Sequence, residues 1–400
     1  MNKMNSKKVG IIGGGILGLA IAYKLQILYP KSKIILFEKD KNLGSHQSGR
    51  NSGVLHCGLA YEPGSLKARL AVSGIKQMTE FCEKNQIPYD LCGKIVVASD
   101  DRQSNFLDNL VYRGKKNGLD GLKILSQQEL KQREPYVKSK KTLLVPQEGI
   151  VDYNKVMSCM AKKIKENDGE ILLSTKIVKV LEKGNEIIIS DNKNDWKLDL
   201  IINCTGLFSD RNYQKFTGEK RPVRIIPFRG EYMSLKHDYS HLVNHLVYPA
   251  PDPKFPFLGV HFTRLINGDR EVGPNAVFAF KREGYSNSHF SFQDTVDSLS
   301  YSGFMKFVLK NFKFSVSELG SSVFKSIFIN QAKKLIPEID SSMLKKGTAG
   351  VRAQAMDKQG KLIMDFNVIR KGNQIHVLNA PSPGATASLS IADYIINNYY

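Results

Sequence analysis

The stretch that most constrains this chain begins at Lys7, ends at Glu38 and reads KKVGIIGGGILGLAIAYKLQILYPKSKIILFE. Its first apolar run, Val9–Ile12, is typical of a strand buried on both faces. An apolar-striped helix is predicted over residues 16–28, and a second strand over residues 34–37. Strand, helix and strand in this order indicate the start of a parallel α/β sheet.

Three glycines stand at the turn between that first strand and the helix, as G-x-G-x-x-G at Gly13, Gly15 and Gly18. Gly13 permits a tight turn, Gly15 lets a pyrophosphate approach the backbone, and Gly18 lets helix and strand pack closely. Glu38 ends the second strand, where its carboxylate can accept hydrogen bonds from a ribose diol. The pattern predicts a dinucleotide site but does not separate NAD from FAD, and its alternative is a glycine-rich turn that binds nothing.

The composition is that of a globular protein, because 42% of the 400 residues are hydrophobic. This length favours two or three domains. There is no apolar run of about eighteen residues, so no spanning helix is expected, and the first strand starts too early for a signal peptide. The 5 cysteines contain no C-x-x-C pair, which argues against a disulfide framework or a zinc site. A cytoplasmic location is expected.

The formal net charge of +20 is the unusual bulk property. It fits an anionic substrate, an anionic membrane surface or a nucleic acid. The alternative is lysine spread evenly over the surface, because no block of five basic residues occurs. No RNA-recognition motif is present, so we expect no nucleic-acid partner.

The later chain reads as an α/β fold in pieces. Helix and strand patterns continue over residues 151–204, whereas short alternating strands rich in proline and glycine fill residues 224–279. We therefore expect a Rossmann-like, discontinuous nucleotide-binding domain with an inserted α+β substrate (cap) domain that contains an antiparallel sheet. The expected nucleotide-binding pieces are residues 1–90, 145–215 and 345–400, and the expected cap pieces are residues 91–144 and 216–344.

Several stretches in order along nearly the whole chain resemble one family. They include HQSGRNSGVLHCGLAYEPGSLKA (46–68), CGKIVVA (92–98), GIVDY (149–153), CTGLFSDR (204–211), GPNAVFAFKREGY (273–285), GVRAQA (350–355) and NAPSPGATAS (379–388). They are similar to the flavoproteins of the D-amino-acid-oxidase superfamily, and most of all to its L-2-hydroxyglutarate dehydrogenase/oxidase branch. The resemblance implies bound FAD, and oxidation of L-2-hydroxyglutarate to 2-oxoglutarate by hydride transfer to flavin N5.

The resemblance also implies roles for particular residues. Arg352 would clamp one substrate carboxylate, since a guanidinium fork suits a carboxylate, and Lys281 or Arg282 would hold the other. Either His56 or His261 would take the hydroxyl proton. Tyr232 and Tyr248 would cap the substrate. The residues expected at the cofactor are Gly13, Gly15, Gly18, Glu38, His46, Ser48, Asn51, Ser52, Thr205, Gly206, Gly384, Ala385 and Thr386.

Other interpretations remain open at this point. An amine or amino-acid oxidase of the glycine or D-amino-acid type is the nearest, followed by an NAD dehydrogenase. Each charged or histidine candidate also has a structural alternative, either a salt bridge or a buried histidine bonded to backbone. His237, His241 and His245 fall four apart, but a strand pattern follows and no acid lies nearby, so no metal is expected.

A segment near residue 305 bears on the electron acceptor, which is expected to be a quinone or oxygen. Lys306, Lys310 and Lys313 fall on one helical face, and apolar side chains fall largely opposite. Such a helix resembles one that lies on an anionic membrane, so peripheral contact with the inner face of a membrane is one expectation. The alternative is a cap helix that turns its apolar face inward.

Overall fold

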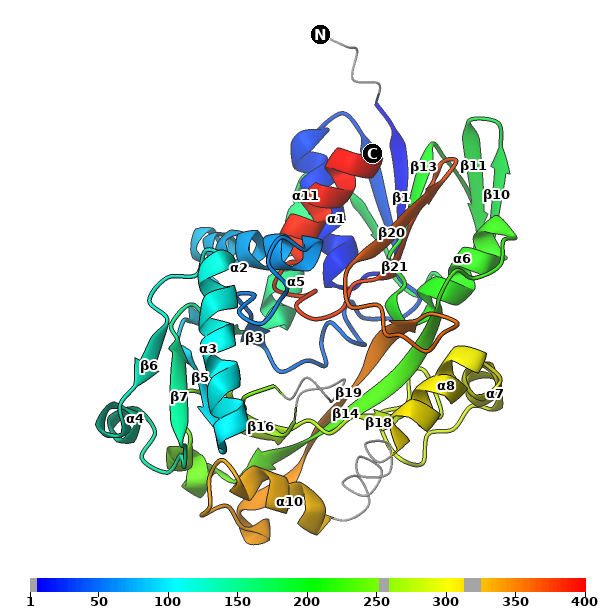
Figure 1. The fold of residues 1–400 in the computed structure, drawn as a ribbon. Helices are drawn as coiled ribbons and strands as arrows, with labels where there is room; N and C mark the ends of the chain where they lie inside the picture. The colour runs from blue at the N-terminus through cyan, green and yellow to red at the C-terminus, as the bar shows by residue number, and fades with distance from the viewer. Residues whose placement is uncertain (1–5, 252–258, 313–324) are drawn as a thin grey trace.

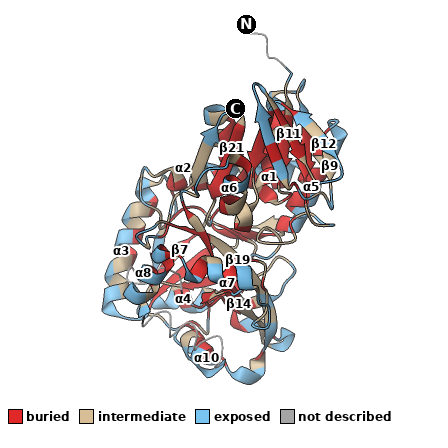
Figure 2. Cartoon of the chain, turned by 90° about the vertical axis from the view of Figure 1, so that its right-hand side faces the viewer, coloured by how far each residue is buried: buried red, intermediate tan, exposed pale blue. Residues whose placement is uncertain are grey.

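The computed structural model describes residues 6–251, 259–312 and 325–400. Its elements form two large sheets with helices around them, one sheet in the upper and one in the lower half of Figure 1. Both sheets are buried along their central strands (Figure 2). This mixed α/β architecture confirms the predicted fold class.

The first sheet has the order β20-β21-β13-β1-β2-β9, parallel except for its edge strand β20. Its strands are β1 (Lys8–Ile12), β2 (Lys33–Phe37), β9 (Glu170–Leu172), β13 (Leu200–Asn203), β20 (Asn367–Lys371) and β21 (Gln374–Asn379). β1 lies between β2 and β13 and pairs with both. β1 and β13 are mostly apolar, as expected for strands that are covered on both faces.

Helices cover one face of this sheet, and a small sheet covers the other. α1 (Ile16–Leu28) packs against α5 (Tyr153–Glu166) and α11 (Ser388–Tyr399), and α11 also contacts α2 (Leu66–Lys84). The opposite face carries β10 (Lys179–Lys183), β11 (Glu186–Ser190) and β12 (Asp195–Leu198) together with α6 (Ser209–Thr217). The first helix and both strands around the glycine turn thus lie where the sequence predicts them.

The second sheet is mostly antiparallel and has the order β18-β14-β17-β16-β15-β5-β7-β6, with β19 paired to β14. Among the described strands of this sheet, only β15 and β5 pair in parallel. The strands are β5 (Lys94–Ala98), β6 (Lys123–Leu125), β7 (Lys141–Val145), β14 (Arg224–Leu235), β15 (Leu246–Pro249), β16 (His261–Arg264), β17 (Arg270–Gly273), β18 (Val277–Phe278) and β19 (Leu344–Met356). Of residues 224–279, where the sequence predicts short strands, residues 252–258 lie outside the described residues.

A fourth, short sheet joins β3 (Val54–Leu55), β8 (Gly149–Val151) and β4 (Tyr89–Asp90). The helices around the second sheet are α3 (Asp101–Lys116), α4 (Gln127–Arg133), α7 (Phe292–Leu299), α8 (Ser302–Lys310) and α10 (Lys325–Lys333). In the part of the chain that the structure describes, none of the helices is both long and apolar enough to span a bilayer.

The domain boundaries stay a prediction, but the pairing of β19 does not fit the boundary predicted at residue 345. The sequence assigns residues 345–400 to the nucleotide-binding domain, whereas β19, at the start of that segment, pairs along its length with β14 in the second sheet. Both strands are long, and their antiparallel pairing satisfies the backbone groups of β19 along its length. This pairing carries Arg352 into the second sheet, opposite Phe228.

Candidate active site

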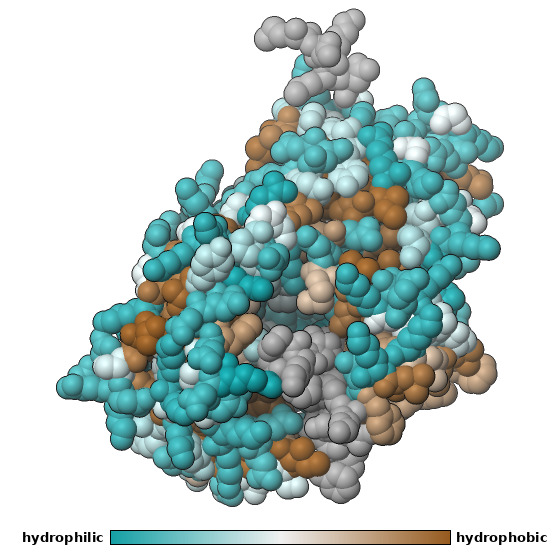
Figure 3. Space-filling model, in the orientation of Figure 1, coloured by the Kyte–Doolittle hydropathy of each residue, from teal (hydrophilic) through white to brown (hydrophobic). Residues whose placement is uncertain are grey.

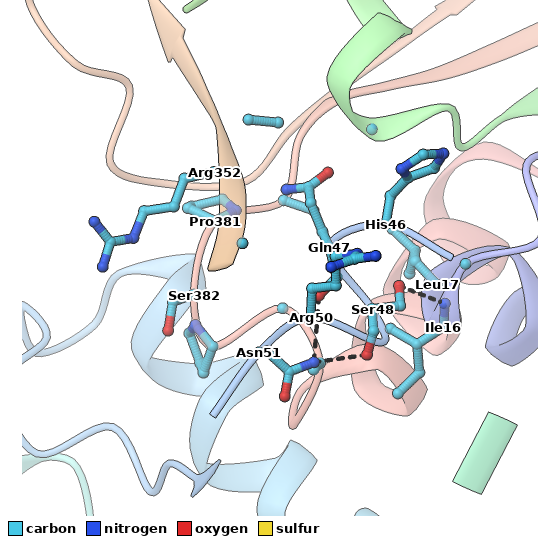
Figure 4. A pocket seen from close by; sticks show the side chains of 18 of the residues that line it. Ile16, Leu17, His46, Gln47, Ser48, Arg50, Asn51, Arg352, Pro381 and Ser382 are labelled. Carbon is cyan, nitrogen blue, oxygen red and sulfur yellow. Dashed lines mark hydrogen bonds between the residues drawn. The ribbon is translucent and has the colours of Figure 1, made fainter. Parts of the chain in front are cut away.

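A cavity of about 890 Å³ lies where the two sheets meet, and residues from both sheets line it. One side is formed by the ends of β1 and β13 and by the loop after β2. The other side comes from β14, β15, β16 and β19. Figure 4 shows Arg352 on its strand at one side of this space, and His46, Ser48 and Asn51 at the other. The volume lies within the usual range for ligand sites, about 300–1,000 Å³.

The glycine turn has the geometry that a pyrophosphate requires. Gly13 has a φ of +114°, which side chains rarely allow, and a Cβ on Gly18 would lie 2.0 Å from the Gly13 carbonyl oxygen. The Gly14 N–H donates to Glu38 Oε2 at 2.6 Å, which ties the acid at the end of β2 to the turn. The N-cap of α1, Gly15, has no side chain that would keep a phosphate away from the backbone of the turn. These residues fit a dinucleotide.

The loop after β2 closes one wall of the cavity. Ser48 Oγ accepts a hydrogen bond from the Ile16 N–H at the start of α1, 3.0 Å away. The Asn51 side chain donates to the Ser48 carbonyl oxygen at 2.6 Å (Figure 4). Ser52, which hydrogen-bonds to Tyr232, lies in the same wall. The loop is thereby held against α1 by its own polar side chains.

Both ring nitrogens of His46 are engaged by protein groups. Nε2 lies 2.8 Å from Asp40 Oδ2 and 2.9 Å from Glu283 Oε1, and Nδ1 bonds to the Tyr285 hydroxyl. Glu283 and Tyr285 belong to the segment between β18 and α7. His46 therefore ties the loop after β2 to the segment between β18 and α7.

The segment before α11 forms a third wall, with Gly384, Ala385 and Thr386 at the cavity. Thr386 Oγ1 lies 2.7 Å from the Tyr153 hydroxyl and accepts the His56 N–H at 3.2 Å. Thr205 and Gly206 approach from the end of β13. Residues from four distant parts of the chain thus meet at one cavity, and of the predicted cofactor residues only Gly18 lies behind the lining, since its task is packing.

His56 belongs to a hydrogen-bonded chain with Glu148 and Lys94 that motif reasoning did not find. Its Nδ1 lies 3.0 Å from Glu148 Oε2, and the other oxygen of Glu148 accepts from Lys94 Nζ at 2.7 Å. Burial alone would raise the pKa of Glu148, but the charges of Lys94 and His56 and their hydrogen bonds lower it to about 2. Glu148 is therefore a carboxylate at any physiological pH.

The second histidine candidate has a different environment. His261 is buried, stacks on Tyr248 with ring centroids 3.9 Å apart, and its Nδ1 lies 3.0 Å from the Gly259 carbonyl oxygen. Burial, followed by the charges of Arg352, His56 and Lys94, lowers its pKa to about 3. His261 is consequently a neutral ring at neutral pH.

This depressed pKa makes an expected contribution to stability. Between pH 6.5 and about 3 the unfolded chain binds a proton at His261 that the folded chain does not. The free energy of unfolding should therefore fall as the pH is lowered through this window, by at most about 1.4 kcal/mol per pH unit from this group. Urea denaturation of the wild type and of His261→Asn from pH 4 to pH 8 checks it. Parallel pH dependences for the two proteins would contradict it.

The arginine candidate and both tyrosine candidates lie together at the cavity. Arg352, Tyr232 and Tyr248 all line it. Burial raises the pKa of Tyr232, whereas the positive charge of Arg352 lowers it, so the phenol and the guanidinium lie within electrostatic reach of each other. Of the three, only Arg352 brings a charge.

Lys281 and Arg282 are not brought to the cavity, and this part of the prediction needs correction. Lys281 is exposed, and Arg282 is fully buried elsewhere. The Arg282 guanidinium bonds to Asp210 Oδ2 at 3.0 Å and to Asp297 Oδ2 at 3.0 Å. A buried guanidinium needs carboxylate partners, and these aspartates lie on α6 and α7. Its task is to join those helices.

Lys94 and Glu148 take the place of these residues as charged groups at the cavity, and both line it. The available signal was a charge inside an apolar run, in CGKIVVA and in PQEGIVDY. Lys94 is buried. A lysine is almost never buried without a partner, and here the partner is Glu148.

The spaced histidines do not assemble. His245 Nδ1 lies 2.8 Å from Glu134 Oε1, and His241 bonds to the carbonyl of Asp238. Among residues 6–251, 259–312 and 325–400, no group of three metal-binding side chains occurs.

Comparison with known proteins gives the same picture. A family model described as FAD dependent oxidoreductase (DAO) matches residues 8–397. L-2-hydroxyglutarate dehydrogenase of Indibacter alkaliphilus is 47% identical over 96% of this chain and 96% of its own. The mitochondrial L-2-hydroxyglutarate dehydrogenase of Homo sapiens is 40% identical over 98% of this chain and 88% of its own.

Solved structures agree on the fold. FAD-bound L-alpha-glycerophosphate oxidase of Mycoplasma pneumoniae superimposes with a TM-score of 0.79 at 21% identity, covering 98% of this chain and 94% of that one. Glycine oxidase of Geobacillus kaustophilus gives 0.72 at 16% identity, covering 98% and 94%. With a family match over nearly its whole length and a glycine cradle that fits the cofactor, this chain belongs to the DAO family of FAD dependent oxidoreductases.

Proposed function

We propose that this enzyme oxidises L-2-hydroxyglutarate to 2-oxoglutarate. The observation that carries the proposal is the charge at the cavity, where Arg352 and Lys94 supply two cationic groups and His56 supplies a ring nitrogen. A substrate with two carboxylates needs two cations, and its hydroxyl needs a proton acceptor. The full-length relatives that bear this activity in their names support the same substrate.

Each group has a distinct task in this proposal. Arg352 binds the carboxylate next to the reacting carbon, because its planar fork fits a carboxylate in two-point contact. Lys94 binds the far carboxylate, in place of Lys281 or Arg282. His56 accepts the hydroxyl proton. FAD, when bound, supplies the redox chemistry by accepting the hydride.

The cofactor assignment divides into two groups of residues. Gly13, Gly15 and Glu38 would hold the pyrophosphate and adenosine half, with Thr205 and Gly206 close to it. The redox half would lie against the remaining walls, formed by His46, Ser48, Asn51, Ser52, Gly384, Ala385 and Thr386. Their positions around one cavity support this division.

The experiment is anaerobic mixing of the yellow holoenzyme with candidate substrates while flavin absorbance is followed. L-2-hydroxyglutarate should bleach the flavin, and glycine and D-amino acids should not. The enantiomer D-2-hydroxyglutarate tests stereochemistry in the same assay. Bleaching by an amino acid and not by L-2-hydroxyglutarate would overturn the proposal in favour of an amine oxidase.

An amine oxidase is the less well supported function. Glycine oxidases share the fold, but at 16% identity they show the fold alone. An amino-acid substrate brings an ammonium group, which the charges of Lys94 and Arg352 would repel.

The electron acceptor is proposed to be a quinone or oxygen, and a quinone would bring the enzyme to a membrane. Helices α7 and α8, which pack against each other, carry an exposed apolar face. We call it the α7–α8 face and define it by Phe280, Phe290, Phe292, Val296, Leu299, Met305, Leu309 and Phe312. Brown surface marks this region at the lower right of Figure 3. Phe292 is 75% and Leu309 73% exposed, whereas Phe304 of the same helix pair is buried.

The charges beside the α7–α8 face favour an anionic surface as its partner. The two acids of this segment, Asp294 and Asp297, turn inward and pair with arginines. The lysines Lys306 and Lys310 are exposed. Lys313, the third lysine of the expected basic face, lies outside the described residues. Apolar side chains flanked by lysines, on helices whose described acids are paired on the inner side, fit the interface of an anionic bilayer.

Replacing two of these side chains should weaken membrane binding. The double variant Phe292→Ser with Leu309→Ser is expected to lose roughly tenfold or more of its affinity for vesicles that contain phosphatidylglycerol, because each buried side chain contributes about 1.5–3 kcal/mol. Co-sedimentation measures it. Tyr112→Ser, an exposed aromatic on α3, is the control. Equal binding by all three proteins, or no binding by the wild type, would remove the membrane from the proposal.

A further inference from the structure

Glu148 lies at the centre of the charged groups in the cavity, although nothing in the motif pattern marks it. It precedes β8, and its side chain is only 2% exposed. One carboxylate oxygen, Oε2, lies 3.0 Å from His56 Nδ1, and the other, Oε1, accepts from Lys94 Nζ at 2.7 Å. Cys57 Sγ is 3.5 Å from Oε1. The two oxygens thus contact two different cavity residues.

The contact with His56 determines where its proton lies. A carboxylate can only accept hydrogen bonds, so the Nδ1 of His56 must carry the hydrogen. When the ring is neutral, Nε2 keeps its lone pair, on a ring that lines the cavity. The His56 backbone is held separately by Thr386 Oγ1, 3.2 Å away. A ring held at Nδ1 and at its backbone presents one nitrogen in one direction.

The contact with Lys94 has a second consequence. A lysine side chain is flexible and its ammonium is a point charge, so its position depends on what holds it. Here the carboxylate of Glu148 holds it and offsets part of the cost of burying it. The ammonium has three hydrogens and Glu148 uses one, which leaves donors for another carboxylate.

We propose that Glu148 is a positioning residue that sets the tautomer of His56 and holds the ammonium of Lys94 for the same substrate. The identity of the substrate rests on the proposed function, whereas the effect of Glu148 on His56 and Lys94 rests on their contacts alone. Glu148 contacts Lys94, His56 and Cys57. Tyr61, Cys92, Tyr153 and Tyr248 lie within its electrostatic reach.

Glu148→Gln is the decisive variant, because an amide has one oxygen where the carboxylate has two. The ammonium of Lys94 can only donate, so the amide oxygen turns to it, and the NH₂ group then faces His56 Nδ1. Nδ1 must accept, and the proton moves to Nε2. The proton acceptor of the reaction is lost while the ring stays in place, as occurs when the aspartate of a serine protease triad becomes asparagine.

Two measurements follow. The ¹⁵N shifts of the histidine side chains, assigned with His56→Asn, should show His56 protonated at Nδ1 in the wild type and at Nε2 in Glu148→Gln. In anaerobic stopped flow with L-2-hydroxyglutarate, the rate of flavin reduction should fall roughly 10²–10⁴-fold, while KM changes much less because Lys94 keeps its partner. Glu148→Asp keeps the charge and should restore part of the rate.

The chain offers a matched control in the pair of Glu134 and His245. Glu134 is also fully buried and lies 2.8 Å from His245 Nδ1, but neither residue lines the cavity. Glu134→Gln should cost stability and leave the rate of flavin reduction within about threefold of the wild type, since it removes a buried charge–histidine contact elsewhere.

The outcomes separate the inference from the proposed function. An unchanged His56 tautomer in Glu148→Gln, or a rate loss no larger than that of Glu134→Gln, would overturn the positioning role. A wild-type flavin that L-2-hydroxyglutarate does not bleach would overturn the proposed function, and the tautomer shift would still be readable. The double variant of Glu148→Gln and His56→Asn should be no slower than His56→Asn alone, because both changes remove one acceptor.

Discussion

Replacing Arg352 with methionine is expected to lower kcat/KM for L-2-hydroxyglutarate by about 10²–10⁴-fold while FAD stays bound. The guanidinium would make two charge-assisted hydrogen bonds to the carboxylate beside the reacting carbon, each worth about 1.5–3 kcal/mol. Methionine keeps much of the apolar stem and removes both bonds. Steady-state kinetics and the ratio of flavin to protein absorbance measure the two effects.

The lysine variant at the same position separates charge from geometry. Arg352→Lys keeps a cation but loses the planar fork, so it should fall between the wild type and the methionine variant. Arg264→Met is the matched control, since Arg264 lies on β16 of the same sheet, pairs with Asp90 and does not line the cavity. A normal kcat/KM for Arg352→Met would take the arginine out of substrate binding.

The second large effect is expected at His56. His56→Asn should slow flavin reduction by roughly 10²–10⁴-fold, which is the usual contribution of a positioned general base. Anaerobic stopped-flow reduction by L-2-hydroxyglutarate measures it. His241→Asn, outside the cavity, is the control.

His261 provides the comparison that assigns the base. With a pKa lowered to about 3, it is a poor proton acceptor near neutral pH, so His261→Asn should slow reduction less than His56→Asn. Its neutral ring instead stacks on Tyr248 and forms part of the cavity wall. A larger loss at His261 than at His56 would reverse the assignment of the base.

The sequence by itself determined the cofactor cradle. Gly13, Gly15 and Gly18 lie in one contiguous run, and their requirements are local: a positive φ, an uncovered backbone and a close approach within one turn. Because these requirements are local, they fix the residue types and their spacing within one short stretch of sequence. The strand, the helix and the acid Glu38 could therefore be predicted together with the glycines. The two-part architecture followed from the change in hydrophobic periodicity along the chain.

Only the tertiary structure decided which charged side chains line the cavity. Arg282 and Lys94 look alike in sequence, each a cation beside an apolar run, yet one is buried against Asp210 and Asp297 and the other lies beside Glu148 at the cavity. Asp210 lies 72 positions from Arg282 in the sequence, and Glu148 lies 54 positions from Lys94.

The physical reason is that a side chain's partners depend on how distant segments pack, whereas a backbone requirement is settled within a few residues. Burial of a charge is tolerated only where a counter-charge arrives from elsewhere in the fold. The same holds for the α7–α8 face. The sequence showed an amphipathic pattern only near residue 305, whereas the exposed apolar side chains of α7, with Asp294 and Asp297 paired to arginines on the inner side, came from the packing.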